Sequence, residues 1–351
     1  LPDNLQAAII SRIDTLNPSQ QLALKVASVI GRIFAYRMLE AIYPVDTDRP
    51  TLPNYMDTLT RLSLTLIESE SPDLAYIFKH AITQEVAYNL MLYSQRRQLH
   101  QSVAEWIEHT YEKNIASYYP LLAYHWMQAA EISDVIHHIN VVEKAVEYLE
   151  KAGDQASENN SNQETIQFFT LALEWESKLP EVQDKEVAHK RKIRMAQWHG
   201  KIGLAYYGLG SLPDCEVHVR EALQLLGAPL PKNNGQFILD LFPQLFLQVL
   251  HWNFSSRFIG VTSDEQDRVA AIEMARLYDL MGRIYFYSNQ TIPIVYTGFR
   301  AMNSAEKAGP SPELASAYSG MSVLMGFLQL HKLAETYVDR AVAISRKFNQ
   351  P

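Results

Sequence analysis

Apolar residues recur at helical spacing through the first part of the chain. Ile9, Ile13 and Leu16 fall on one face of a helix predicted over residues 3–16, which Asn17-Pro18 ends. The same periodicity predicts three further helices, near Leu22–Ile30, over Phe34–Tyr43 and from about Met56 to Leu66. We therefore expect a small helical domain at the beginning of the chain.

Two short apolar runs interrupt this helical pattern. They span Leu64–Glu68 and Leu74–Phe78 and flank the turn-forming segment Ser69–Asp73, so they predict a β-hairpin. Three helices followed by a hairpin is the order of a winged helix-turn-helix. Helical periodicity returns from about His80 to Tyr111.

Beyond residue 120 the sequence predicts helices alone, and their pattern repeats four times. In each unit an apolar and a small residue precede a bulky one and a turn, and the second helix ends in an Ala-Leu-like pair. The small residues are Gly153, Gly203, Gly282 and Ser322, and the turn residues are Asn160, Gly210, Asn289 and Gln329. This is the tetratricopeptide pattern, in which the small residue lets two helices approach closely.

The spacing of the units departs from the ideal tetratricopeptide period. Gly153, Gly203, Gly282 and Ser322 are 50, 79 and 40 residues apart, whereas the ideal period is about 34 residues. We therefore expect longer or additional helices. The predicted fold is mainly all-α. Residues 1–116 form a helical segment and a winged helix-turn-helix with a small β-hairpin, and residues 117–351 form a tetratricopeptide-like α-α helical solenoid.

The longest gap between units contains a strongly apolar run over residues 237–250. A membrane span needs about 20 apolar residues, whereas this run includes Asp240 and Pro243 and two glutamines. The run therefore predicts a buried or docking helix, and we expect no membrane association.

Composition and charge narrow the class of protein. With 351 residues, of which 47% are hydrophobic and 20% charged, the chain is expected to fold as two or three packed units, not as a disordered or fibrous protein. The net charge is -8, whereas a protein whose main function is to bind the phosphates of nucleic acid is expected to be positively charged. The single cysteine, Cys215, forms no internal disulfide and no signal peptide is evident, which predicts a cytoplasmic location. Because the chain starts at Leu1 without a methionine, we expect it to be a piece of a longer protein.

Motifs for catalysis are missing from the sequence. It has no Gly-x4-Gly-Lys-Ser/Thr phosphate loop, no His-Glu-x2-His and no Cys-x2-Cys. His137-His138 lacks an evident third metal ligand, and Cys215 occupies a small position of a repeat, where packing is expected. We predict no catalytic residues, no metal site and no cofactor in this chain, which is therefore expected not to be an enzyme.

The predicted winged helix has few of the basic residues that a sequence-specific DNA-binding domain needs. Its recognition helix, around Tyr55–Ser63, carries a single Arg61 against Asp57, with Glu68 nearby. Sequence-specific readers bring several basic side chains to the phosphates and base edges. The prediction is a structural or regulatory winged helix that binds no nucleic acid.

Several segments resemble a known family of signalling proteins. Leu1–Gln6, Ser11–Leu16 and Ala27–Phe34 are similar to the segment that follows the ATPase module of STAND-type ATPases. Phe78–Tyr88 and Gln95–His100 resemble the next signature of these proteins, particularly those fused to class III adenylate/guanylate cyclase domains, including relatives of soluble adenylyl cyclase. Similarity to their repeat region occurs in Tyr285–Asn289 and Ala308–Ala315.

The resemblance implies a cyclase or other effector domain, then an ATPase module that binds ATP or ADP with Mg, and then this chain. In STAND proteins a histidine of a Met-His-Asp motif touches the phosphates of ADP, and His80 has a similar place. Lys79 and Ala81 depart from that motif, so His80 either senses nucleotide or caps and packs its helix. Arg96 and Arg97 either face an acidic surface of the ATPase module or are solvated.

The leading functional hypothesis is a non-catalytic regulatory and sensor region that binds a protein or peptide on the concave face of the repeats. Candidate contacts on the first helices are His199, Tyr206, Tyr278 and Tyr285. Alternative hypotheses are the sensor region of a STAND transcription regulator and an oligomerisation scaffold.

Overall fold

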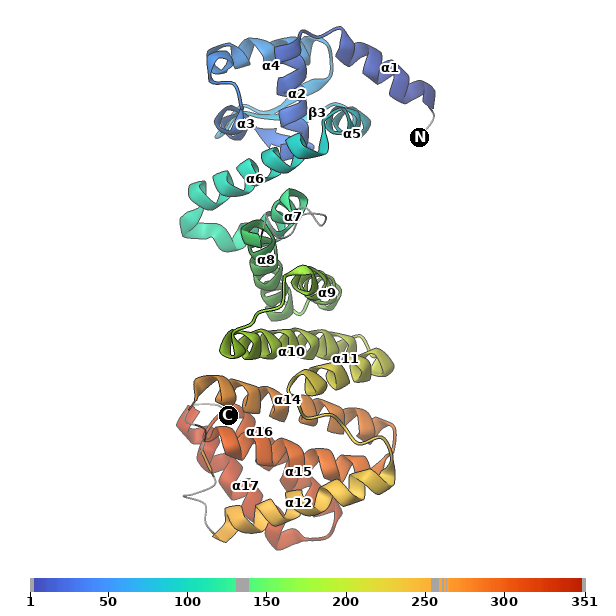
Figure 1. Ribbon diagram of the computed structural model, residues 1–351, viewed down its shortest axis with the longest axis vertical. Coiled ribbons are helices and arrows are strands. Elements are labelled where there is room, and N and C mark those ends of the chain that lie inside the picture. Colours follow the sequence, from blue (N-terminus) through green and yellow to red (C-terminus); the bar gives the residue numbers. More distant parts are fainter. Residues whose placement is uncertain (1–2, 131–138, 254–258, 261, 263, 349–351) are drawn as a thin grey trace. The chain divides into compact units, whose positions relative to one another are not determined.

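The chain is mainly helical, with its helices in stacked pairs and a small three-stranded antiparallel sheet near the N-terminus (Figure 1). The computed structural model describes residues 3–130, 139–253, 259–260, 262 and 264–348. This architecture confirms the predicted fold class.

Contacts divide the chain into two compact units. The first comprises Leu1–Ala152 and Glu174–Pro180, and the second comprises Gly153–Leu173 and Glu181–Pro351. The domain boundary expected after residue 116 falls inside the first unit, and it stays a prediction.

The first unit begins with the elements of a winged helix. They are α1 (Asp3–Asp14), α2 (Pro18–Ile30), β1 (Ile33–Ala35), α3 (Tyr36–Ile42), α4 (Leu52–Arg61), β2 (Thr65–Ser69), β3 (Ala75–Phe78) and α5 (Ala81–Asn89). The strand order is β1-β3-β2, and both neighbouring pairs are antiparallel. The predicted hairpin is β2 with β3.

Local chemistry explains where these elements begin and end. At the start of α2, the side chain of Asn17 accepts a hydrogen bond from the backbone of Gln20, whose side chain accepts one from the backbone of Asn17. The helix predicted as far as Leu66 ends at Arg61, because Ser63 has a positive φ of 54° and Leu66 belongs to β2. The helix predicted from Phe34 is preceded by a strand, since Phe34 pairs with Tyr76 of β3.

Helices alone follow in the described part of the remaining chain. They are α6 (Tyr93–Thr110), α7 (Tyr119–Ala129), α8 (Ile139–Glu158), α9 (Asn162–Lys178), α10 (Lys185–Gly208), α11 (Leu212–Leu225), α12 (Asn234–Asn253), α14 (Glu265–Tyr287), α15 (Thr291–Ala308), α16 (Pro312–Phe327) and α17 (His331–Ser345), besides short 3-10 turns. In the second unit α10 pairs with α11, α14 with α15, and α16 with α17.

The small residues of the repeat pattern lie where paired helices approach. A Cβ atom on Gly153 would lie 2.8 Å from the ring of Phe169, and one on Gly203 would lie 3.1 Å from Val219. The turn residues Asn160, Gly210, Asn289 and Gln329 all have positive φ, at 57°, 78°, 54° and 61°. One left-handed residue thus reverses the chain in each of the four predicted pairs.

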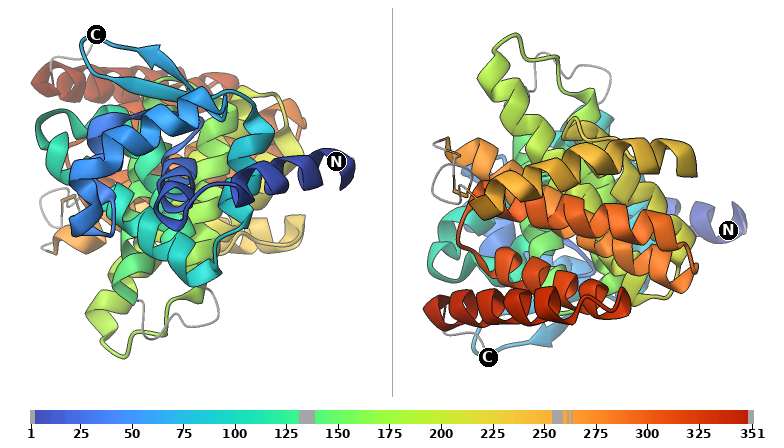
Figure 2. Two further views of the ribbon diagram at one scale, coloured as in Figure 1. Left: turned by 90° about the horizontal axis from the view of Figure 1, so that it is seen from above. Right: turned by 90° about the horizontal axis from the view of Figure 1, so that it is seen from below.

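The apolar run between the second and third predicted repeats forms α12, which packs along α15 (Figures 1 and 2). Its outer side exposes Leu239, Phe242, Phe246 and Val249. No helix in the part of the chain that the structure describes is long and apolar enough to cross a membrane.

Candidate functional site

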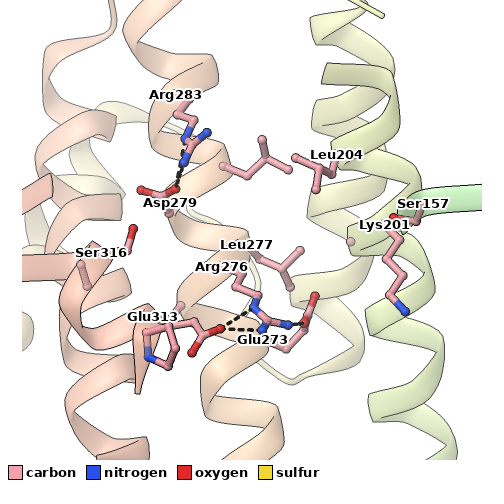
Figure 3. Close-up of a pocket in the computed structure, with 15 residues that line it drawn as sticks. Ser157, Lys201, Leu204, Glu273, Arg276, Leu277, Asp279, Arg283, Glu313 and Ser316 are labelled. Carbon is pink, nitrogen blue, oxygen red and sulfur yellow. Dashed lines mark hydrogen bonds and ion pairs between the residues drawn. The ribbon is translucent and has the colours of Figure 1, made fainter. Parts of the chain in front are cut away.

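The first helices of successive pairs in the second unit line a hollow of about 530 Å³ (Figure 3). Leu204 comes from α10, Leu277 and Leu280 come from α14, and Ala317 comes from α16. These side chains give the hollow an apolar floor. Lys201, Arg276 and Arg283 line it together with Glu273, Asp279 and Glu313.

The arginines of this hollow form ion pairs with its acidic side chains, whereas Lys201 pairs with Asp154 of α8. Nε of Arg276 donates to Oε1 of Glu313 at 3.0 Å, and Nη1 of Arg276 lies 3.5 Å from Oε2 of Glu273. About two turns further along α14, Nη2 of Arg283 donates to Oδ2 of Asp279 at 2.8 Å. The ion pair of Arg276 with Glu313 links α14 to α16 (Figure 3).

Exposure within these pairs is unequal. The side chain of Arg276 is 57% exposed, whereas those of its partners Glu273 and Glu313 are 8% and 16% exposed. Arg283 is 52% exposed beside Asp279 at 37%. The hollow is lined by equal numbers of basic and acidic side chains. Because the arginines are the more exposed partners, the surface that a ligand meets nevertheless presents more guanidinium than carboxylate groups.

Glu273 lies under this surface because α10 leaves room for it. A Cβ atom on Gly200 would lie 2.5 Å from Oε1 of Glu273, so a larger residue at that position would displace the end of this side chain. Burial raises the pKa of Glu273 to about 7, against the opposing effect of Arg276. Near neutral pH a fraction of Glu273 is protonated, which shifts the balance of charge in the hollow toward the cations.

A second hollow of about 790 Å³ continues from the first, and residues of α14, α15 and α16 line it. The two share Asp279, Arg283 and Ala317 as lining residues. The second is mainly apolar, and its rim includes Phe286 and Phe327, which are 59% and 73% exposed. Together they form one groove, called here the α14–α16 groove, with a charged end at Arg276 and an apolar end at Phe327.

Comparison with known proteins gives distant similarities. No family model matches the chain. It is 25% identical over 208 residues to an uncharacterized protein of Rhizobium meliloti (strain 1021), a match that covers 59% of this chain. The match spans 19% of the length of that relative.

Two solved structures match the chain with low TM-scores. BtubC (BKLC) from P. vanneervenii has a TM-score of 0.41 and 11% identity, covering 73% of this chain and 82% of that one. A Signal Transduction ATPase with Numerous Domains (STAND) protein with a tetratricopeptide repeat sensor, from Pyrococcus horikoshii, has a TM-score of 0.30 and 11% identity, covering 96% of this chain and 52% of that one.

The aromatic and histidine candidates on the first helices lie away from the charged hollow. Nδ1 of His199 lies 3.0 Å from Nδ1 of His218 on α11, and the ring of Tyr206 stacks on the same His218. Tyr278 and Tyr285 are buried, at 0% and 2% exposure. Tyr278 lines the apolar hollow, although its relative exposure to solvent is 0%.

The candidates in the first unit lie around α5 and the start of α6. His80 is exposed at the N-cap of α5, and its side chain makes no capping hydrogen bond. The guanidinium of Arg96 lies over the ring of Tyr88 at 4.6 Å, and its Nη2 donates to the carbonyl of Asn89 at 3.0 Å. Arg97 is half-buried on α6. Arg96 is thus held against α5.

The remaining chemical candidates give no reactive cluster in the described residues. Cys215 is buried in the core of the second unit, and burial raises the pKa of its thiol to about 12. Among those residues no group of three or more His, Cys, Asp and Glu could hold a metal ion. His137-His138 lies outside them.

The sequence-based candidates did not include Arg276 and Arg283. The sequence pattern that could have identified them is a row of charged residues on one helix. Glu273, Arg276, Asp279 and Arg283 are spaced by three, three and four residues. Such spacing places them on one face of α14, whose other faces are apolar.

Proposed function

We propose that this chain is a non-catalytic sensor and protein-interaction region of a STAND signalling ATPase, with the α14–α16 groove as the place where a protein segment binds. The observation that supports binding is the groove itself, an open apolar and charged channel between α14 and α16, with α15 lining its apolar part. Stacked helical pairs use such extended surfaces to hold peptides and proteins.

The link to a STAND ATPase is supported by the order of elements and by local sequence. A winged helix precedes helical pairs, and the segments Phe78–Tyr88 and Gln95–His100 resemble the signatures that follow the ATPase module. In this proposal the ATPase module precedes the chain and a nucleotide cyclase is its effector domain. Reading the gene on both sides of this coding segment tests the layout, and a gene without an upstream phosphate-loop ATPase would contradict it.

Binding in the groove is tested by a pair of matched glycine substitutions on α16. Gly320 lines the apolar hollow, and a Cβ atom there meets nothing within 4 Å, so Gly320→Leu adds a side chain at the groove without a clash at its Cβ atom. Gly326 has the same free space on the same helix but does not line the groove, which makes Gly326→Leu the control.

The binding experiment starts from peptides selected on the purified chain from a phage-displayed library. We expect Gly320→Leu to weaken binding of the selected peptides at least tenfold and Gly326→Leu to leave it unchanged. Circular dichroism should show equal helix content in both variants. Equal affinities for all three proteins would place the binding surface elsewhere.

His80 is proposed as a contact to nucleotide in the upstream module. Its exposed side chain at the N-terminal end of α5 supports this role, because a histidine and free backbone N–H groups can both donate to a phosphate. In the intact protein, His80→Ala should raise basal effector output by weakening the ADP-bound state. Unchanged output together with unchanged nucleotide occupancy would contradict the contact.

A further inference from the structure

The two ends of the α14–α16 groove differ in chemistry, and this difference restricts what fits in it. At one end Arg276 and Arg283 point their guanidinium groups to the surface, while Glu273 and Glu313 lie largely beneath them. At the other end the rim is made of exposed Phe286, Phe327 and Val323.

Charge complementarity favours an anionic group at the first end. Each guanidinium uses part of its donor set on a carboxylate of the groove and keeps further N–H groups on its exposed side, because it has five donors in a planar fork. A carboxylate of a ligand can therefore bind Arg276 or Arg283 without breaking the existing ion pairs. A ligand ammonium would meet these cations first and be repelled.

The apolar end favours large aliphatic or aromatic side chains. Phe286 and Phe327 stand exposed on neighbouring helices, and Gly320 keeps the space near them free of side chains. Apolar side chains placed there would remove both phenylalanine rings from water.

The length of α14 sets the distance between the two ends. From Arg276 to Phe286 the helix rises about 15 Å, at about 1.5 Å per residue. An extended peptide covers that distance with about five residues, since each spans at most about 3.3–3.6 Å.

We infer that the occupant of the α14–α16 groove is a protein segment that carries acidic residues next to an apolar block, within about five residues of each other. This inference rests on the proposed function and adds the chemical class of the partner. The acidic residues bind Arg276 and Arg283, and the apolar block packs on Phe286, Val323 and Phe327.

The test uses six capped decapeptides, three compositions in two orders each, that share one apolar block of alternating leucine and phenylalanine. The block is joined through one serine to three glutamates, three lysines or three serines, in both orders. A ten-nucleotide single-stranded oligothymidylate serves as a fourth probe, because cations beside exposed aromatic rings also suit nucleic acid. Affinities are measured by fluorescence anisotropy on the wild-type chain and its variants.

Two substitutions, each with a control, distinguish the effect of the charge of Arg283 from occupancy of the groove. Arg283→Gln removes a cation that lines both hollows and is half-exposed, so the fold should be retained. Lys332→Gln, at an exposed position on α17, is its control. Gly320→Leu against Gly326→Leu reports whether a probe occupies the groove at all.

We expect the glutamate peptide to bind at least tenfold more tightly than the serine and lysine peptides. Arg283→Gln and Gly320→Leu should each weaken it about tenfold, the two controls should not, and added salt should weaken it further. If the lysine or serine peptide binds as tightly and Gly320→Leu abolishes that binding, the inference is overturned while the proposed groove function stands. The inference is likewise overturned, while the proposed groove function stands, if the oligothymidylate binds more tightly than the glutamate peptide and Gly320→Leu abolishes that binding. If no probe responds to Gly320→Leu, the inference and the proposed groove function both fail.

Discussion

Nδ1 of His100 lies 2.8 Å from Nδ1 of His125 in the interior of the first unit. The hydroxyl of Tyr88 lies 3.0 Å from Nε2 of the same His100, so three side chains from α5, α6 and α7 form one buried chain of hydrogen bonds. A hydrogen bond between two Nδ1 atoms requires that one donates and the other accepts. The pair is therefore compatible with two neutral rings in complementary tautomers.

This pair predicts that the chain loses stability in mild acid. Burial lowers the pKa of His100 to about 4 and that of His125 to about 3, from an ordinary value of 6.5. Because the unfolded chain takes up protons at higher pH than the folded one, the stabilisation is complete above pH 6.5 and is lost as the pH falls toward 4. Urea unfolding at a series of pH values should show the midpoint falling over that range.

The imidazole nitrogens report on the same prediction directly. In ¹⁵N spectra the rings of His100 and His125 should remain neutral at pH 5.5. His199, whose pKa burial lowers to about 4, should behave like the first pair. Charged rings for His100 and His125 at pH 5.5 would refute the buried neutral pair.

Replacing Gly153 by a larger residue is predicted to destabilise the fold. A Cβ atom there would lie 2.8 Å from the ring of Phe169, which is fully buried. Gly153→Ala should lower the free energy of unfolding by about 1–2 kcal/mol, because overpacking exceeds the gain in helix propensity. Gly326→Ala, where a Cβ atom meets nothing within 4 Å, should raise it by about 0.5–1 kcal/mol. Stabilisation by both substitutions would show that Phe169 moves away freely.

The carboxylate of Glu306 is predicted to hold α12 in place. It is fully buried, accepts hydrogen bonds from Tyr318 at 2.8 Å and Gln248 at 2.6 Å, and contacts Nδ1 of His251. Glu306→Leu removes the acceptor for these groups, and we expect a loss of about 3–5 kcal/mol. Hydrogen exchange should accelerate most in α12, whereas the exposed Asp339→Asn should leave it unchanged.

Gln329 is the turn residue whose replacement by glycine should help. It has a φ of 61°, a left-handed conformation that costs a residue with a side chain about 1–2 kcal/mol and glycine almost nothing. Gln329→Gly should therefore raise the free energy of unfolding by about 1 kcal/mol. Gln290→Gly is the matched control, since its φ of -101° gives glycine no advantage. A loss of stability at both positions would mean that the side chain of Gln329 contributes more than its backbone costs.

The sequence predicted the helical pairs and the hairpin because both depend on short-range patterns. Gly153 and Gly203 stand where paired helices meet, at the spacing that the pattern requires. The strand β1 was missed since its three residues, Ile33–Ala35, form a strand through pairing with β3 and have no periodicity of their own. The end of α4 depends on the positive φ of Ser63, which the apolar spacing does not indicate.

The binding surface on the first helices stays a prediction. Of its candidate residues, Tyr278 lines the α14–α16 groove, whereas His199, Tyr206 and Tyr285 do not. Tyr278 and Tyr285 lie in the core because α14 packs against α10, α11, α15 and α16. With so much of its circumference covered, α14 keeps a narrow exposed row that includes Arg276 and Arg283. Which row stays open depends on the neighbours of a helix, and these are known only from the fold.

The attachment of α12 also bears on how the second unit unfolds. In an ideal array each helical pair contacts only its neighbours, so pairs can open one after another from an end. Here Glu306 of α15 binds Gln248 of α12 and Tyr318 of α16, which joins two pairs and the added helix through one side chain. These helices should therefore melt as a single cooperative block, which gives this end of the chain a sharper transition than separate repeats would have.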